Sequence, residues 1–181
     1  MTGTFMLAAP FVATPSGAVT AHSKVPTLLS LVVPGPAGFD SDATDETGGG
    51  PTGKIGFSEA ASADCDPAGL TQGQWIGSVL RYFDNNPTDP ETYVILCVTQ
   101  LRSAKAATAN RNRVAALDFA SAPAGLHVPG AHMRNVGPGW QFAFSRSNYF
   151  VWVVGVSATN QLKGLAFATN TVRREYARLP K

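Results

Sequence analysis

Charged residues are scarce in this chain of 181 residues. Asp, Glu, Lys and Arg together make up 14% of it, whereas a typical soluble domain has about a quarter. The hydrophobic fraction is 44%. This excludes an intrinsically disordered chain, because disordered chains combine low hydrophobicity with high charge. We therefore expect one folded domain of ordinary size with a real core.

Long hydrophobic runs are missing as well, since no stretch approaches the roughly 20 apolar residues of a membrane span. Near the N-terminus an apolar stretch at residues 5–12 is followed, at residues 18–21, by the small-x-small spacing that a signal peptidase accepts. A secretory signal begins with a positively charged region, but the first basic residue is Lys24. We expect residues 1–24 to be a truncated signal peptide or else a flexible N-terminal arm, and residues 25–181 to be a single domain.

Cysteine occurs only twice. Cys65 lies in the acidic segment ADCDP, and Cys97 lies inside a strand-like run. An even number of cysteines in an exported chain predicts a disulfide, which would contribute on the order of 3 kcal/mol by closing a loop of about thirty residues. Two unrelated buried thiols of a cytosolic protein are the alternative. With the N-terminal pattern, the cysteines favour a protein that is secreted or held in the cell envelope.

A nucleotide-binding loop has the right spacing but the wrong context. Residues 48–54 read as glycine, four residues, then glycine and lysine. Such a loop needs Ser or Thr after its lysine to hold magnesium, and Ile55 stands there. The carboxylates just before the loop would also repel a polyphosphate. We therefore expect no bound nucleotide, and instead an ion pair of Lys54 with Asp45 or Glu46.

Other catalytic and metal-binding patterns are absent too. Residues 155–159 begin like a serine nucleophile elbow, but Thr159 replaces its final glycine. His127 and His132 lie five positions apart without the Cys, Asp or Glu neighbours that would complete a metal site. No catalytic, cofactor-binding or metal-ligating residue is therefore assigned. No cofactor is expected, and the sequence favours a non-enzymatic protein.

The order of the expected elements gives the fold class. β-Prone runs bounded by turn formers predict strands. Core-facing residues at helical spacing, which follow the capping residue Ser103 and the capping residue Thr159 or Asn160, predict helices. The expected elements are strands at 27–33 and 54–57, loops at 39–52 and 122–139, hairpins at 75–83/92–101 and 140–144/149–156, and helices at 104–120 and from 161 onward. The apolar run 93–98 predicts a central strand covered on both faces. We expect an α+β fold, a mainly antiparallel sheet built from two β-hairpins with two main helices packed on one face.

Acidic and basic residues are unevenly distributed along the chain. Up to Glu91 there are ten carboxylates and three basic residues, and after it there are two carboxylates and eleven basic residues. Such a split occurs in proteins that bind nucleic acid or membranes. The basic residues are scattered, however, and are not grouped with aromatics as on a nucleic-acid platform. We expect the two halves to pack against each other with complementary charges.

Four residues are candidates for lining a ligand pocket. Most of the aromatic residues fall on expected strands and belong to the core, but alternation turns some of them outward. Trp140, directly after a Gly-Pro-Gly turn, is placed to rim a ligand pocket. We expect the pocket to be lined by Trp140, Trp75, His127 and His132.

Four segments of the chain resemble small secreted proteins and lipoproteins of mycobacteria and related actinobacteria that carry domains of unknown function. They read LLSLVVPGPAGF, ADCDPAGL, YVILCVTQLRSAKAA and YFVWVVGVSATNQLKGLAFATNTVRREYARL. The layout is similar to the extracellular sensor domains of mycobacterial serine/threonine kinases, which keep two disulfides where this chain can form one. The resemblance covers most of residues 25–179. It implies an envelope or extracellular protein and carries over no functional residue.

Three hypotheses about function follow. The first is a secreted, non-enzymatic protein of the cell envelope or extracellular space that binds a small apolar ligand, a glycan or a protein partner. The second is a secreted hydrolase with a site formed by the loops 34–53 and 122–139. The third is a protein that binds anionic lipid or nucleic acid through its basic C-terminal half.

Overall fold

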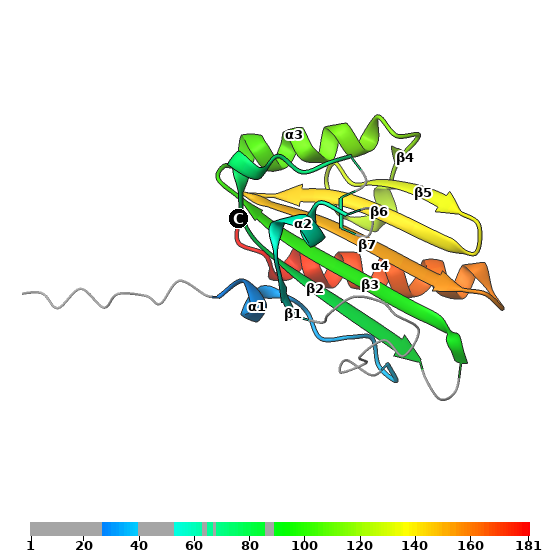
Figure 1. The fold of residues 1–181 in the computed structure, drawn as a ribbon. Coiled ribbons are helices and arrows are strands. Elements are labelled where there is room, and N and C mark those ends of the chain that lie inside the picture. The colour runs from blue at the N-terminus through cyan, green and yellow to red at the C-terminus, as the bar shows by residue number, and fades with distance from the viewer. Residues whose placement is uncertain (1–26, 40–52, 63–64, 67, 86–88) are drawn as a thin grey trace, which may run out of the picture.

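One antiparallel sheet organises the chain. The computed structural model describes residues 27–39, 53–62, 65–66, 68–85 and 89–181. In them, seven strands follow the order β1-β2-β3-β7-β6-β5-β4, as Figure 1 shows. The strands are β1 Gly53–Ile55, β2 Trp75–Asn85, β3 Asp89–Leu101, β4 Ala120–Ser121, β5 His132–Val136, β6 Gly139–Arg146 and β7 Tyr149–Ser157. The helices are α1 Leu28–Leu31, α2 Phe57–Ala60, α3 Ala104–Ala115 and α4 Gln161–Arg178, with short 3-10 helices at Gln72–Gln74 and Ala124–Leu126. The α+β class and the two predicted hairpins, β2/β3 and β6/β7, are confirmed.

The central strands β3 and β7 are buried on both faces, as the apolar run 93–98 predicts. Successive residues of a strand point to opposite faces. Leu96 and Cys97 are neighbours on β3, and both are buried, yet they belong to two separate hydrophobic cores. The same holds for Trp152 and Val153 on β7. Each face of the sheet therefore needs another element packed on it to shield its apolar side chains from water.

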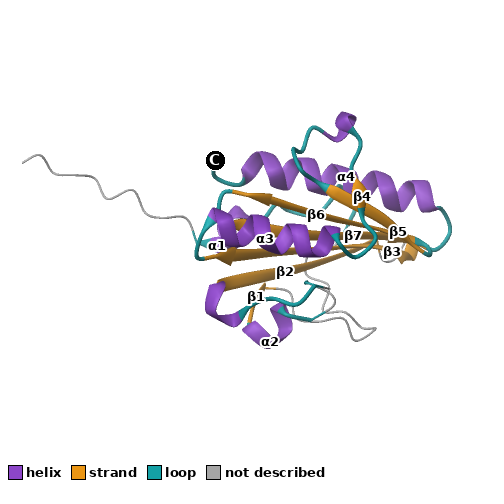
Figure 2. Cartoon of the chain, turned by 90° about the horizontal axis from the view of Figure 1, so that it is seen from above, coloured by secondary structure: helices purple, strands orange, loops and turns teal. Residues whose placement is uncertain are grey.

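The two main helices supply these covers from opposite sides, so the expectation that both pack on one face is wrong. Val172 of α4 belongs to the core that contains Leu96 and Val153. Val114 of α3 belongs to the other core, with Cys97 and Trp152. Figure 2 shows both helices together with the sheet, seen from above. The physical reason is that large apolar side chains on both faces of β3 and β7 would be left in water if one face lacked a helix.

Both predicted helix caps are confirmed. The Ser103 hydroxyl accepts the backbone N–H of Ala106 at 3.1 Å at the start of α3. The Asn160 side chain accepts two backbone N–H groups at the start of α4. Such caps satisfy donors that the first helical turn leaves without partners. α3 ends at Ala115, earlier than expected, and the chain then turns through Asp118 at a φ of 63°.

Residues 27–33 do not form the expected strand. The helical turn α1 forms first, the backbone is extended at Val32, and Val32 and Val33 belong to the core on the α4 face. A strand edge would satisfy the backbone N–H of Val33, but here a side-chain carboxylate on α4 does so.

The predicted loop 122–139 contains β5, whose residues show no apolar alternation that would mark a strand. The predicted loop 39–52 lies outside the described residues apart from its first residue.

α4 approaches β7 closely because glycines face each other at the contact. A Cβ built on Gly155 would lie 2.5 Å from the carbonyl oxygen of Gly164 and 2.7 Å from the Cβ of Ala168. Backbone therefore meets backbone where the helix crosses the sheet. Among the residues that the structure describes, no helix is long and apolar enough to cross a membrane.

Candidate ligand-binding site

A buried disulfide anchors the segment that leads into β2. Cys65 and Cys97 are bonded, with their Cα atoms 5.4 Å apart, and each is 1% exposed. The bond joins an irregular segment to the central strand β3. The predicted disulfide is therefore confirmed.

The residue next to Cys65 is a buried acid that binds α3. Asp66 is 2% exposed. Its Oδ1 accepts the backbone N–H of Ala68 at 3.0 Å, and its Oδ2 accepts the side-chain amide of Asn110 at 2.7 Å. Burial raises the pKa of the Asp66 carboxyl, and these hydrogen bonds and the charge of Arg113 only partly offset it. A covalent bond and a hydrogen bond thus hold this segment between β3 and α3.

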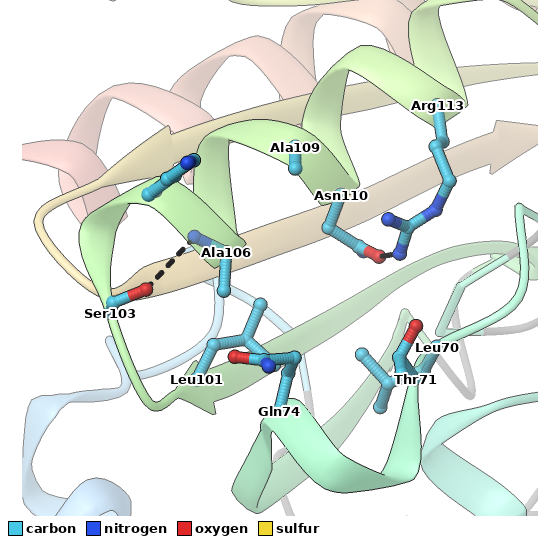
Figure 3. A pocket seen from close by; sticks show the side chains of 10 residues that line it. Leu70, Thr71, Gln74, Leu101, Ser103, Ala106, Ala109, Asn110 and Arg113 are labelled. Carbon is cyan, nitrogen blue, oxygen red and sulfur yellow. Dashed lines mark hydrogen bonds between the residues drawn. The ribbon is translucent and has the colours of Figure 1, made fainter.

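A groove lies between α3 and residues 70–74, with a volume of about 390 Å³. We call it the α3 groove. Ala106, Ala109, Asn110 and Arg113 border it from the helix, because residues three and four apart share one helix face. Figure 3 shows the facing side chains that come from Leu101 and from residues 70–74.

The wall formed by residues 70–74 is tied to the start of α3. The backbone N–H of Arg102 donates to the carbonyl oxygen of Gln74 at 2.8 Å, and its Nε donates to the carbonyl oxygen of Gly73 at 2.8 Å. Leu70 and Leu101 are buried beneath the groove. The α3 groove therefore has an apolar floor and two fixed walls.

Among the described residues, two cations and no carboxylate line the α3 groove. Arg113 stands at one end, where it donates to the side-chain oxygen of Asn110 and to the carbonyl oxygen of Gly69 at 3.3 Å. Lys105 is exposed near the start of α3. The only acid of the network, Asp66, lies behind Asn110 and does not line the groove. The groove therefore offers apolar contact and a positive potential.

His127 and His132 line a second hollow, of about 510 Å³, beside β4 and β5. His127 is exposed, whereas His132 is half-buried and its Nδ1 has no hydrogen-bond partner. Burial and then the charge of Arg111 lower the pKa of His132. Among the described residues no group of three or more His, Cys, Asp or Glu side chains gathers at a possible metal site.

The two tryptophans lie elsewhere. Trp140 on β6 packs at the edge of the α4-face core, opposite Gly155 of β7. Trp75 begins β2, donates to the Ser78 hydroxyl at 2.9 Å, and borders a third hollow near Lys54. The structure thus brings the two histidines together but brings neither tryptophan to them.

The described parts of the loops 34–53 and 122–139 both contact α4 through neighbouring arginines. Arg174 donates to the carbonyl oxygen of Gly35 at 3.3 Å. Arg173 donates to the carbonyl oxygens of Gly125 and Leu126, at 2.6 and 3.2 Å. Residues 40–52 of the first loop lie outside the described residues, so a site formed by these two loops stays a prediction. Lys54 lies in the edge strand β1 opposite Val79, and its expected partners Asp45 and Glu46 lie outside the described residues.

Sequence reasoning missed the residues that organise the α3 groove. The available signal is Asn110, an amide in the otherwise small and apolar buried stripe of α3 with Ala107 and Val114. A buried amide needs hydrogen-bond partners. In the sequence, the aspartates beside Cys65 were candidate acceptors for this amide.

No protein-family model matches the chain, and no curated protein matches it. Among solved structures, the crystal structure of the extracellular domain of PknH from Mycobacterium tuberculosis is similar. The TM-score is 0.44 at 12% sequence identity, and the match covers 65% of this chain and 76% of that chain. Similarity at this level supports no conclusion about function.

Proposed function

We propose that this chain is an exported, non-enzymatic binding domain of the cell envelope or extracellular space, and that the α3 groove holds a small ligand with an apolar body. The observation that carries the proposal is a groove whose two walls are both fixed. Asn110 ties the helix wall to Asp66, and Arg102 ties the opposite wall to the start of α3. A preformed site of this kind loses little conformational freedom when a ligand enters.

The volume and the floor of the groove favour a small apolar ligand over a glycan. A volume of about 390 Å³ falls in the range of small-molecule sites, roughly 300–1,000 Å³. The floor consists of Leu70 and Leu101, with Ala106 and Ala109 beside them. Leu and Ala side chains offer no hydrogen bonds to the hydroxyl groups of a sugar.

The disulfide supports the proposed location. Disulfides persist in oxidising compartments and are rare in the cytosol. Cys65 and Cys97 are bonded within the core on the α3 face, so the bond belongs to the folded domain. The proposed signal peptide at residues 1–24 agrees with this location.

Binding is tested with N-phenyl-1-naphthylamine, a neutral apolar dye whose fluorescence rises in an apolar site. The proposal expects saturable binding to the wild-type protein. Ala106→Leu and Ala109→Leu should each weaken it about tenfold or more, because the longer side chain fills the groove. Thr108→Leu adds an apolar side chain to an exposed position of the same helix that does not line the groove, and it should bind as the wild type does.

Two results would overturn the binding proposal. One is the absence of saturable dye binding to folded wild-type protein. The other is equal binding by all four proteins, which would place the dye outside the groove. Circular dichroism spectra of the variants establish that each one is folded.

Export is tested by mass spectrometry of the mature protein recovered from the medium and envelope of the cells that make it. The proposal expects a chain that begins after the segment 18–21 and carries the Cys65–Cys97 bond. A cytosolic chain with an intact N-terminus and free thiols would contradict it.

A further inference from the structure

The α3 groove contains an arginine whose side chain is held in place by buried groups. Arg113 donates through Nη2 to the side-chain oxygen of Asn110 and to the carbonyl oxygen of Gly69. Asn110 is fully buried and donates in turn to Asp66, which is 2% exposed. A buried pair of polar groups therefore fixes the orientation of an exposed guanidinium.

This arrangement leaves part of the guanidinium available. Both hydrogen bonds of Arg113 use Nη2, and no described residue accepts a hydrogen bond from its Nε or Nη1. Both edges that bind a carboxylate with two parallel hydrogen bonds include Nη2, so Nε and Nη1 each offer a single charge-assisted hydrogen bond instead. An arginine already fixed through Nη2 loses little side-chain entropy when it forms one of them.

The electrostatics of the groove select the sign of the ligand charge. The described residues that line it include two cations and no acid. Arg113 lies eight residues beyond Lys105 on α3, which separates the two by roughly 12 Å along the helix axis at 1.5 Å per residue. One carboxylate therefore reaches one of them, and Arg113 is the one that the protein positions.

We propose, on the basis of the proposed function, that the ligand of the α3 groove is a small amphipathic carboxylate. Its carboxylate accepts one charge-assisted hydrogen bond from Arg113, through Nη1 or Nε, and its apolar body lies along the floor formed by Leu70 and Leu101. Asn110 and Asp66 act as positioning residues because they orient the guanidinium. Lys105 adds general positive potential and makes no defined contact with the ligand.

The test uses displacement of N-phenyl-1-naphthylamine from the folded chain by three ten-carbon competitors: decanoate, decanol and decylamine. Their apolar chains are matched and their head groups are negative, neutral and positive. Decanoate should displace the dye at a concentration about tenfold or more below that of decanol, as a charge-assisted hydrogen bond predicts. Decylamine should be the weakest competitor.

Two variants that each remove one positive charge show which residue causes the preference for decanoate. Arg113→Gln should abolish the preference for decanoate over decanol while the dye still binds. Lys105→Gln removes the same charge from the same groove and should keep most of the preference. Arg113→Lys retains the charge but lacks the planar fork that contacts Asn110, Gly69 and the ligand together, so it should keep only part of the preference.

The outcomes separate the two proposals. If the dye binds and decanoate and decanol displace it equally, the carboxylate proposal fails and the proposed function stands. If Arg113→Gln and Lys105→Gln reduce the preference equally, general electrostatics explains it and the assignment to Arg113 is overturned. If the dye does not bind the folded wild type, both proposals fail.

Discussion

The backbone N–H of Val33 donates to Oε2 of Glu175 at 2.9 Å, and this bond joins residues 142 positions apart. Glu175 is fully buried on α4, and its Oε1 has no hydrogen-bond partner among the described residues. Arg178 on the same helix donates to the carbonyl oxygen of Ser30. The segment around α1 is therefore held on the sheet by side chains of α4, and a single buried acid lies at the centre of the contact.

Burial raises the pKa of Glu175 to about 7, against the opposing effects of the Val33 N–H and the charges of Arg178 and Arg174. A folded-state pKa above the unfolded value of 4.5 means that the folded protein binds the extra proton. Its contribution to stability is therefore full below pH 4.5 and is lost as the pH rises through about 7. The loss is on the order of 3 kcal/mol. Urea unfolding at pH 5 and pH 8 should give lower stability at pH 8.

Glu175→Gln mimics the protonated acid and should be more stable than the wild type at pH 8 but not at pH 5. Asp118→Asn, at an exposed acid, should leave the pH dependence unchanged. Some dependence should persist in Glu175→Gln, because burial also raises the pKa of Asp66. Parallel pH profiles for wild type and Glu175→Gln would contradict the assignment.

Removal of the disulfide should strongly destabilise the domain. The bond spans 32 positions, and loops of this length give on the order of 3 kcal/mol. The double variant Cys65→Ala/Cys97→Ala should lose about this much in urea unfolding. Because both cysteines are 1% exposed, a thiol reductant should cleave the bond in the wild type only as the domain unfolds. Rapid reduction of the native protein, followed by thiol labelling, would show that the bond is accessible.

Gly155→Ala should be among the most destabilising glycine-to-alanine substitutions in the described part of the chain. The new methyl group would lie 2.5 Å from the carbonyl oxygen of Gly164, and backbone cannot move aside as a flexible side chain can. Overpacking of this kind costs about 1–3 kcal/mol. Gly73→Ala is the matched control, because nothing lies within 4 Å of its added Cβ. Equal melting temperatures of the two variants would contradict the close approach of α4 and β7.

Asp66→Ala should affect both stability and dye binding. It leaves the buried amide of Asn110 and the N–H of Ala68 without their acceptor, which costs about 1–3 kcal/mol for each buried group. It should also weaken dye binding in the α3 groove, because Asp66 helps to hold the helix wall. Glu59→Ala, on α2 away from the groove, should bind the dye as the wild type does.

The hairpins and caps were predictable because their signals are local. The turn formers between β2 and β3 and the side chains of Ser103 and Asn160 act within a few residues of themselves. The assignment of α3 and α4 to opposite faces was not predictable in this way, because it depends on which strands become central. The run that contains Leu96 and Cys97 did indicate a strand covered on both faces, and that signal conflicted with helices on one face.

The candidate site was less predictable than the fold. Asp66 and Asn110 are 44 positions apart, and neither residue has a motif that marks it as a partner of the other. The position of residues 27–33 is likewise decided by Glu175, from the far end of the chain. Single-sequence patterns report propensity and periodicity, whereas these contacts depend on tertiary packing.

The arginines of α4 give part of the basic C-terminal half a structural role. Arg173 spans two successive carbonyl oxygens, and Arg178 directs two nitrogens at one. These guanidiniums bridge segments of backbone, so the donors that make these bonds are already used in the fold, although the positive charges remain. A lysine at either position would keep the charge but lose the paired hydrogen bonds to backbone carbonyls, because an ammonium is a compact point charge without the planar fork of a guanidinium.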